Sequence, residues 1–196
     1  MNYNYRYRLN PSDDLRERVA WTVDTCRQVY NHFLHRLNRH DDTSSYSEQK
    51  RLPDLKDWWT DLRDVHSKAL QKVVQRLYDN LSTLKSRKKN GYSVGGLKWK
   101  APGEYQSFTY SQSGFKLKNT SGRTRLWLSK IGDIPITFHR DLPDDASIKT
   151  VTIKREPTGK WYAILGVETP DAPPEKPDEV TDAVGIDVGI LKYVHD

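Results

Sequence analysis

A block of basic and aromatic residues is the first feature of this sequence that could do chemistry. Residues 85–130 carry 11 Lys and Arg side chains and a single acid, Glu104, and aromatic residues such as Tyr92 and Trp99 lie among the cations. Cations neutralise phosphates and release condensed counterions, while aromatic faces stack on unpaired bases. The block therefore predicts a nucleic-acid partner. The alternative is a solvated basic face without a partner.

A lone carboxylate, Asp187, is the second such feature. It sits in the apolar run "AVGIDVGI", two residues before Gly189. Because burying an unpaired carboxylate is costly, a divalent metal with phosphate is a natural partner. Ribonuclease-H-like nucleases use such an Asp for metal, and actin-like sugar kinases use it at the ATP phosphates. A third alternative is an Asp that accepts backbone hydrogen bonds in a hairpin turn.

Histidine and cysteine give weaker signals. His32 and His35 are three residues apart on a predicted helix, but no third ligand lies at metal-binding spacing, so a polar helix face is expected. The single cysteine, Cys26, falls in the apolar stripe of the same helix and is expected in the core.

The first half of the chain is predicted to be mainly helical. Tyr and Leu alternate with polar residues over 3–9, which predicts a half-buried strand. Apolar spacings of three and four then predict a long helix over about 13–39, a second helix after Pro53 and another from Ser67. Residues 11–90 are thus expected to form an all-helical unit of three or four helices.

The second half changes to a period of two, which is typical of strands. Two strands are expected on either side of Ser113-Gly114, and "EPTGKW" predicts a hairpin turn. The strand candidates are "QSFTY", "FKLK", "TRLWLS", "IPITFHR", "IKTVTIKRE" and "WYAILGVE". Phe108, Tyr110 and Phe115 are expected in the core of this unit. The pattern favours an α+β fold, in which an antiparallel β unit, a barrel completed by the first strand, is split by the helical insertion.

Composition limits the class of protein. The chain has 196 residues, a formal net charge of +6, 35% hydrophobic residues and no apolar run long enough to span a bilayer. The N-terminus lacks an apolar signal core, so a soluble, cytoplasmic protein is expected. The Pro- and acid-rich segment 169–182 predicts a linker, and 183–196 predicts the first hairpin of a further domain.

Seven segments in the same order resemble one known family, the OrfB/TnpB proteins of bacterial and archaeal insertion sequences. These are transposon-encoded, RNA-guided DNA endonucleases related to type V CRISPR effectors. The segments are "YRYRLNPS", "CRQVYNHFL", "LQKVVQRL", "KNGYSVGGLKWKAPGEYQSFTYSQSGFKL", "LSKIGDIPITFHR", "GKWYAI" and "VGIDVGI".

The resemblance implies a layout. Residues 1–10 and 91–168 would form a wedge-like β-barrel, 11–90 a helical recognition domain, and 183–196 the start of a RuvC-like nuclease domain. The implied partners are a guide RNA derived from the transposon end and double-stranded target DNA. The side chains expected to contact nucleic acid are Tyr5, Arg6, Arg8, Lys85, Arg87, Lys88, Lys89, Tyr92, Lys98, Trp99, Lys100, Lys116, Lys118, Arg123 and Arg125.

The family cuts DNA with Mg²⁺ held by three acids, of which Asp187 matches the first. The other two acids have no counterpart in the sequence, so the metal site is expected to be incomplete and the chain inactive as a nuclease on its own. Three functions follow: a nucleic-acid-binding portion of a TnpB-type nuclease, a nuclease-less DNA-binding regulator from the same family, or a sugar kinase beginning at "GIDVG". The last is disfavoured because that motif opens the kinase fold, whereas here about 180 residues precede it.

Overall fold

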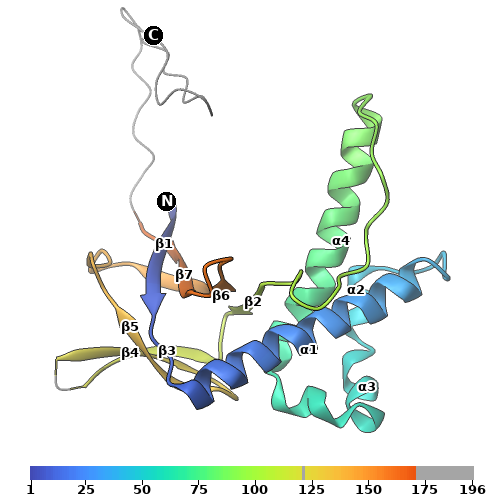
Figure 1. The fold of residues 1–196 in the computed structure, drawn as a ribbon. Coiled ribbons are helices and arrows are strands. Elements are labelled where there is room, and N and C mark those ends of the chain that lie inside the picture. Colours follow the sequence, from blue (N-terminus) through green and yellow to red (C-terminus); the bar gives the residue numbers. More distant parts are fainter. Residues whose placement is uncertain (121, 171–196) are drawn as a thin grey trace, which may run out of the picture.

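The computed structural model describes residues 1–120 and 122–170, and these form an α+β fold with one antiparallel sheet (Figure 1). One strand precedes all the helices and six strands follow them. The helices are α1 (Asp13–Leu37), α2 (Ser45–Gln49), α3 (Leu52–Trp58), the 3-10 helix η1 (Thr60–Asp64) and α4 (Ser67–Lys89). The strands are β1 (Asn2–Leu9), β2 (Ser107–Ser111), β3 (Phe115–Thr120), β4 (Arg123–Leu128), β5 (Gly132–Thr137), β6 (Ser147–Arg155) and β7 (Trp161–Glu168).

The first strand lies in the middle of the sheet. The strand order is β2-β6-β7-β1-β5-β4-β3, and β1 pairs with β7 along its whole length, from Asn2 opposite Glu168 to Leu9 opposite Trp161. On its other side β1 meets β5 through Arg8 and Leu9. The N-terminal strand therefore joins two three-stranded halves that come from later in the chain, and the helices are inserted between it and them.

The sheet is strongly curled, and its connectivity requires this. β2 and β3 are the two edge strands, yet only Gln112, Ser113 and Gly114 separate them in the chain. Edges of a flat seven-stranded sheet would be about 29 Å apart, whereas four peptide steps span at most about 14 Å. The sheet must therefore bend until its edges meet at this corner. It forms a half-barrel, since no strand pairing joins β2 to β3 in the described part of the chain.

Alternate residues of the strands fill the inside of the half-barrel. The fully buried side chains there include Tyr7, Phe108, Tyr110, Leu126 and Ile153. Phe108 and Tyr110 were expected in this core and are buried, whereas Phe115 is half-buried at its margin. Burial of large aromatic side chains supplies much of the apolar stabilisation of such a sheet.

The helical unit has its own buried stripe. Val29 and Phe33 of α1 face the core, as do Leu70, Val74 and Leu77 of α4, at the spacing expected of amphipathic helices. Cys26 also lies in this stripe, and burial raises the pKa of its thiol to about 12. The cysteine is therefore a core residue, as its position in the helix predicts.

An ion pair fixes α2 against α1. The buried Glu48 accepts hydrogen bonds from Arg36 at 2.6 and 3.2 Å, and Arg51 lies 3.3 Å away. Burial alone would raise the pKa of Glu48. The hydrogen bonds and positive charges of Arg36 and Arg51 outweigh burial and lower the pKa, so the carboxylate is ionised at neutral pH.

The element predictions are largely confirmed. The long first helix, the helix near Pro53, the helix from Ser67 and all the strand candidates are present, and "EPTGKW" turns between β6 and β7. The strands on either side of Ser113-Gly114 exist but do not pair with each other. The short helix α2 was not predicted, because its five polar residues carry no apolar stripe.

Some expectations concern residues outside the described ranges. The linker from residue 171, the 183–196 hairpin and Asp187 lie outside the described residues. Among the described residues, no helix combines the length and the apolar character that a membrane crossing needs.

The first prediction concerns Gly114, at the corner between β2 and β3. Gly114 has a φ of +87°, and a Cβ placed there would lie 2.6 Å from the His66 ring, which packs on Tyr110 at a centroid distance of 5.1 Å. Gly159 has a similar φ of +77° but open space around it. Gly159→Ala should therefore lower the free energy of unfolding by about 1 kcal/mol, from backbone strain alone.

Gly114→Ala should cost about 1–3 kcal/mol more than Gly159→Ala, because overpacking adds to the same strain. Urea denaturation of both variants measures the difference. Equal losses of stability in the two variants would show that the His66 contact does not restrict this corner.

Candidate nucleic-acid interface

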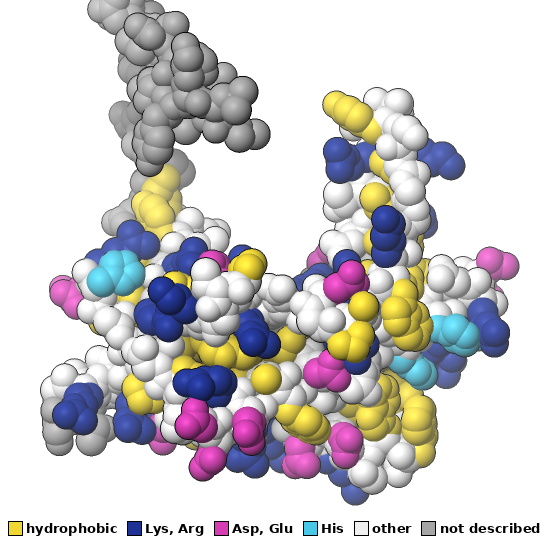
Figure 2. Space-filling view, viewed as in Figure 1, with side chains coloured by type: hydrophobic (Ala, Val, Ile, Leu, Met, Phe, Trp, Pro, Cys, Tyr) yellow, Lys and Arg dark blue, Asp and Glu magenta, His cyan; other side chains and the backbone are white. Residues whose placement is uncertain are grey.

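The outer half of α4 projects from the molecule and carries the first four cations of the basic block. Figure 1 shows this part of the helix standing clear of the sheet, with the following segment returning alongside it. Residues 80–103 hold six Lys or Arg and no Asp or Glu. On the face seen in Figure 2, the outer part of the projection shows Lys and Arg without acidic neighbours. We call residues 80–103 the basic finger.

The cations at the tip of the finger are available to a ligand. Lys85, Lys88 and Lys89 are exposed, and they form no ion pair with any residue of the described chain. Arg87 lies 5.7 Å from the ring centre of Tyr92, which is itself 61% exposed. Cations in the last turn also complement the negative end of the helix dipole, so the tip is both a stable helix end and a concentrated positive charge.

The returning segment is fastened to α1 by one buried amide. Asn31, 2% exposed, donates from Nδ2 to the Lys100 carbonyl at 2.8 Å and accepts from the Lys100 N–H at 2.9 Å. Arg27 donates to the same carbonyl at 3.1 Å and is itself held by Asp24 at 2.6 Å. These bonds fix an irregular segment that has no strand or helix of its own.

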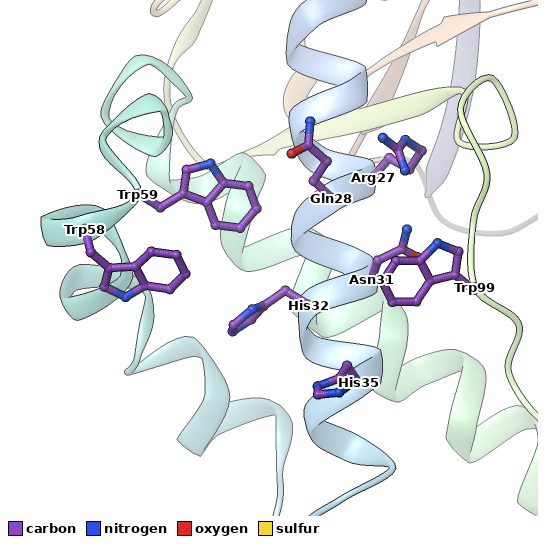
Figure 3. A pocket seen from close by; sticks show the side chains of 8 residues that line it. All are labelled: Arg27, Gln28, Asn31, His32, His35, Trp58, Trp59 and Trp99. Carbon is purple, nitrogen blue, oxygen red and sulfur yellow. The ribbon is translucent and has the colours of Figure 1, made fainter.

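The anchored segment and α3 enclose a groove on the exposed face of α1. Figure 3 shows its floor formed by α1 side chains, including His32 and His35, with Trp58 and Trp59 on one side and Trp99 on the other. The groove has a volume of about 490 Å³. Trp58 is 67% exposed and Trp99 60% exposed. Two of the most exposed large aromatic side chains of the described chain thus line one groove.

The His32 imidazole on the floor of the groove is uncharged near neutral pH. Burial, and then the nearby Arg36 guanidinium, lower the pKa of His32 below its usual value, and this outweighs the opposing effect of Glu48. The His32 ring lies 6.2 Å from Trp58 and 6.3 Å from Trp59. In the described residues no group of three or more His, Cys, Asp or Glu side chains is placed to hold a metal ion.

A second basic cluster lies on the β3–β4 hairpin. Lys116, Lys118, Arg123 and Arg125 all belong to these two strands, and part of their charge is balanced. Lys118 pairs with Asp133 at 2.9 Å, and Arg125 donates to the Asp133 carbonyl at 3.5 Å. In Figure 1 this hairpin and the tip of α4 lie on opposite sides of the molecule.

A third cluster lies on the outer face of the sheet. The Arg6 guanidinium stacks 3.9 Å from the ring centre of Tyr162, with Arg8 at 5.5 Å, and Glu156 pairs with Arg6 at 3.0 Å. Hydrogen bonding from Arg8 and Arg6 lowers the pKa of the Tyr162 hydroxyl. The half-buried Tyr5 ring instead packs under Arg140, at 4.6 Å.

The structure thus divides the predicted contact residues into separate groups. Residues Lys85–Lys89, Tyr92 and 98–100 lie together in the basic finger, whereas the hairpin group and the Arg6–Arg8 group lie elsewhere. Sequence reasoning missed Trp58, Trp59 and Asn31 as parts of a site. The adjacent tryptophans of "DWW" were a visible signal, since two large aromatics in a polar segment are unusual on a free helix end.

Two comparisons with known proteins bear on this chain. Residues 1–40 match the model of the OrfB_IS605-type helix-turn-helix domain. Over 97% of its length the chain is 29% identical to a Streptomyces pristinaespiralis protein whose name attributes to it RNA-guided DNA endonuclease activity. Both matches support the resemblance of the chain to the OrfB/TnpB family. The chain spans about half of that relative, since the alignment covers 46% of the relative's length.

The segment that matches the helix-turn-helix model has a different local structure in this chain. It consists of β1 and α1, and α1 runs without a turn for 25 residues. The partners of α1 come from outside the matched segment, namely α2, α4 and the returning part of the basic finger. Within residues 1–40 there is accordingly no helix-turn-helix in the structure.

The second prediction concerns Asn31, which anchors the returning segment at Lys100. Asn31→Ala removes a donor and an acceptor and leaves the Lys100 N–H without its partner, so the free energy of unfolding should fall by about 1–3 kcal/mol. Trypsin should also cut more rapidly after Lys98 and Lys100, because the segment loses its attachment. Limited proteolysis followed by mass spectrometry measures this.

Gln28→Ala is the matched control for Asn31→Ala. Gln28 is exposed and bonds to Asp24 at 2.8 Å, so its loss should change stability by less than about 0.5 kcal/mol and leave cleavage unchanged. Unaltered cleavage in Asn31→Ala would contradict the anchoring role.

Proposed function

We propose that residues 1–170 are a nucleic-acid-binding unit of the TnpB type, which holds RNA and the target DNA beside it. The observation that carries the proposal is the basic finger, whose six cations have no acid among them. Four of these cations, Lys85, Arg87, Lys88 and Lys89, lie on the projecting end of α4. A phosphate backbone is the ligand that such a surface fits best, because each neutralised phosphate releases counterions.

Similarity to the OrfB/TnpB family supports the same function. The relative's name attributes to it RNA-guided DNA cleavage, which requires that some part of that protein binds both nucleic acids. In this chain the half-barrel with its helical insertion would correspond to the wedge and recognition parts expected from the resemblance. Asp187, the acid expected to hold Mg²⁺, lies outside the described residues, so the function proposed for residues 1–170 is binding rather than cleavage.

A second candidate is a DNA-binding regulator without nuclease activity. The match of residues 1–40 to a helix-turn-helix model favours it. The single continuous helix α1 weighs against it, because a recognition helix of that class follows a tight turn. The two functions differ in ligand: the regulator binds duplex DNA tightly without RNA, whereas the proposed unit binds structured RNA at least as tightly.

Salt dependence of binding is the third prediction. We expect the chain to bind a structured RNA with an affinity that falls steeply as salt rises, since several phosphates are contacted at once. Filter binding of RNA and of duplex DNA across a salt series measures the slope of log K against log salt. Micromolar or weaker binding of both ligands with a flat slope would contradict the proposal. Tight binding of duplex DNA alone would favour the regulator.

The basic finger should account for much of that slope. Replacing Lys85, Arg87, Lys88 and Lys89 with Gln should reduce the slope by about 0.7–0.9 for each phosphate that the protein no longer neutralises. A matched control replaces Arg16, Lys50, Lys149 and Lys160 with Gln, which removes the same charge from other surfaces. An equal reduction of the slope in the two variants would mean that net charge, and not the finger, determines binding.

A further inference from the structure

The groove over α1 has walls that are fixed before any ligand arrives. Trp58 and Trp59 stack on each other at 6.0 Å with an interplanar angle of 25°, and His32 lies against both. On the other side Trp99 immediately precedes Lys100, whose backbone Asn31 holds with two hydrogen bonds. Little conformational entropy is therefore lost in ordering these walls when a ligand enters, which is the condition for a pre-formed site.

The exposure of the indoles indicates that a ligand completes this surface. Of the six tryptophans, three line the groove, and two of those are more than half exposed. Elsewhere in the half-barrel Trp161 is buried in the core. Large flat aromatic faces left open to water are the feature that proteins use for stacking.

The charges around the groove indicate which kind of flat ligand fits. Lys98 and Lys100 flank Trp99, and no Asp or Glu is among the residues that line the groove. Arg27 also lines it, although its charge is partly balanced by Asp24. A methylated or quaternary ammonium would therefore meet cations instead of the acids that usually help to hold it. A flat ring attached to a phosphate chain satisfies both the aromatic walls and the cationic rim.

The floor of the groove can also contact the edge of such a ring. Gln28 and His35 are exposed there and carry groups that donate and accept hydrogen bonds, while Asn31 is already committed to Lys100. The volume of about 490 Å³ accommodates a base together with its sugar. A base inside a duplex cannot offer its faces to indoles, so the ring must be unpaired.

We infer that the groove binds one unpaired nucleobase, stacked between the tryptophans, with its phosphates at Lys98 and Lys100. This inference rests on the proposed nucleic-acid binding and adds a base-stacking site to it. Both an RNA loop and a displaced DNA strand present such a base. Binding of RNA and of DNA oligonucleotides distinguishes these two sources.

The test compares strands that differ only in their bases. Fluorescence anisotropy would measure binding of ten-nucleotide oligo(rA) and oligo(dA), each beside an abasic strand of the same sugar, length and charge. The protein should prefer the strand with bases by about 5- to 100-fold, the range typical of one stacked base. The sugar that shows the larger preference identifies the source of the base.

Variants then assign the preference to the groove. Trp58→Ala combined with Trp99→Ala should abolish the preference while leaving affinity for the abasic strands unchanged, and Trp→Phe at both positions should retain part of it. Tyr46→Ala is the control, because Tyr46 is an equally exposed aromatic (69%) outside the groove, and it should keep the full preference.

The possible results separate the base-stacking site from the proposed nucleic-acid binding. If the wild-type chain binds strands with and without bases equally, the stacking site is wrong while phosphate binding stands, and the groove then belongs to another class of partner. If it binds neither strand and no structured RNA, the proposed function itself fails. If a base preference survives in the double Ala variant, the bases stack elsewhere.

Discussion

The pairing of β1 with β7 is the constraint on which the rest of the structure depends. An eight-residue ladder places the first strand of the chain between two groups of strands that come nearly 100 residues or more later. Without it the sheet would separate into β2-β6-β7 and β3-β4-β5, each too small to bury the aromatic core. The ladder also fixes where α1 begins, since only three residues join β1 to α1.

From that starting point, short-range contacts determine where the basic finger and the groove lie. α1 presents Asn31 to the returning segment and His32 to α3, so one helix orients both walls. α4 is set on the corner of the half-barrel, where His66 packs on Tyr110 and Arg76 donates to the Ser107 carbonyl at 3.2 Å. The projection of α4 is thus braced at its base by the sheet.

The sequence predicted the elements much better than their arrangement. Alternation over 107–111 and 115–120 is a local property and identified both strands. Their placement on opposite edges is not local, because neighbouring strands in a chain usually pair. The five-residue α2 was missed because it depends on reciprocal capping between Ser44 and Ser47 instead of an apolar stripe. Trp58 and Trp99 are far apart in the chain, and only the folding of the finger onto α1 brings them to one groove.

The projection of α4 also has a consequence for how quickly a ligand is captured. The helical residues from 80 to 89 extend about 15 Å, which is longer than the screening length of about 8 Å at physiological ionic strength. The positive potential at the tip is therefore not cancelled by the acidic side chains near the sheet. A polyanion diffusing past meets an attractive field before it touches the body of the protein, so the finger should raise the rate of encounter as well as the strength of the final complex.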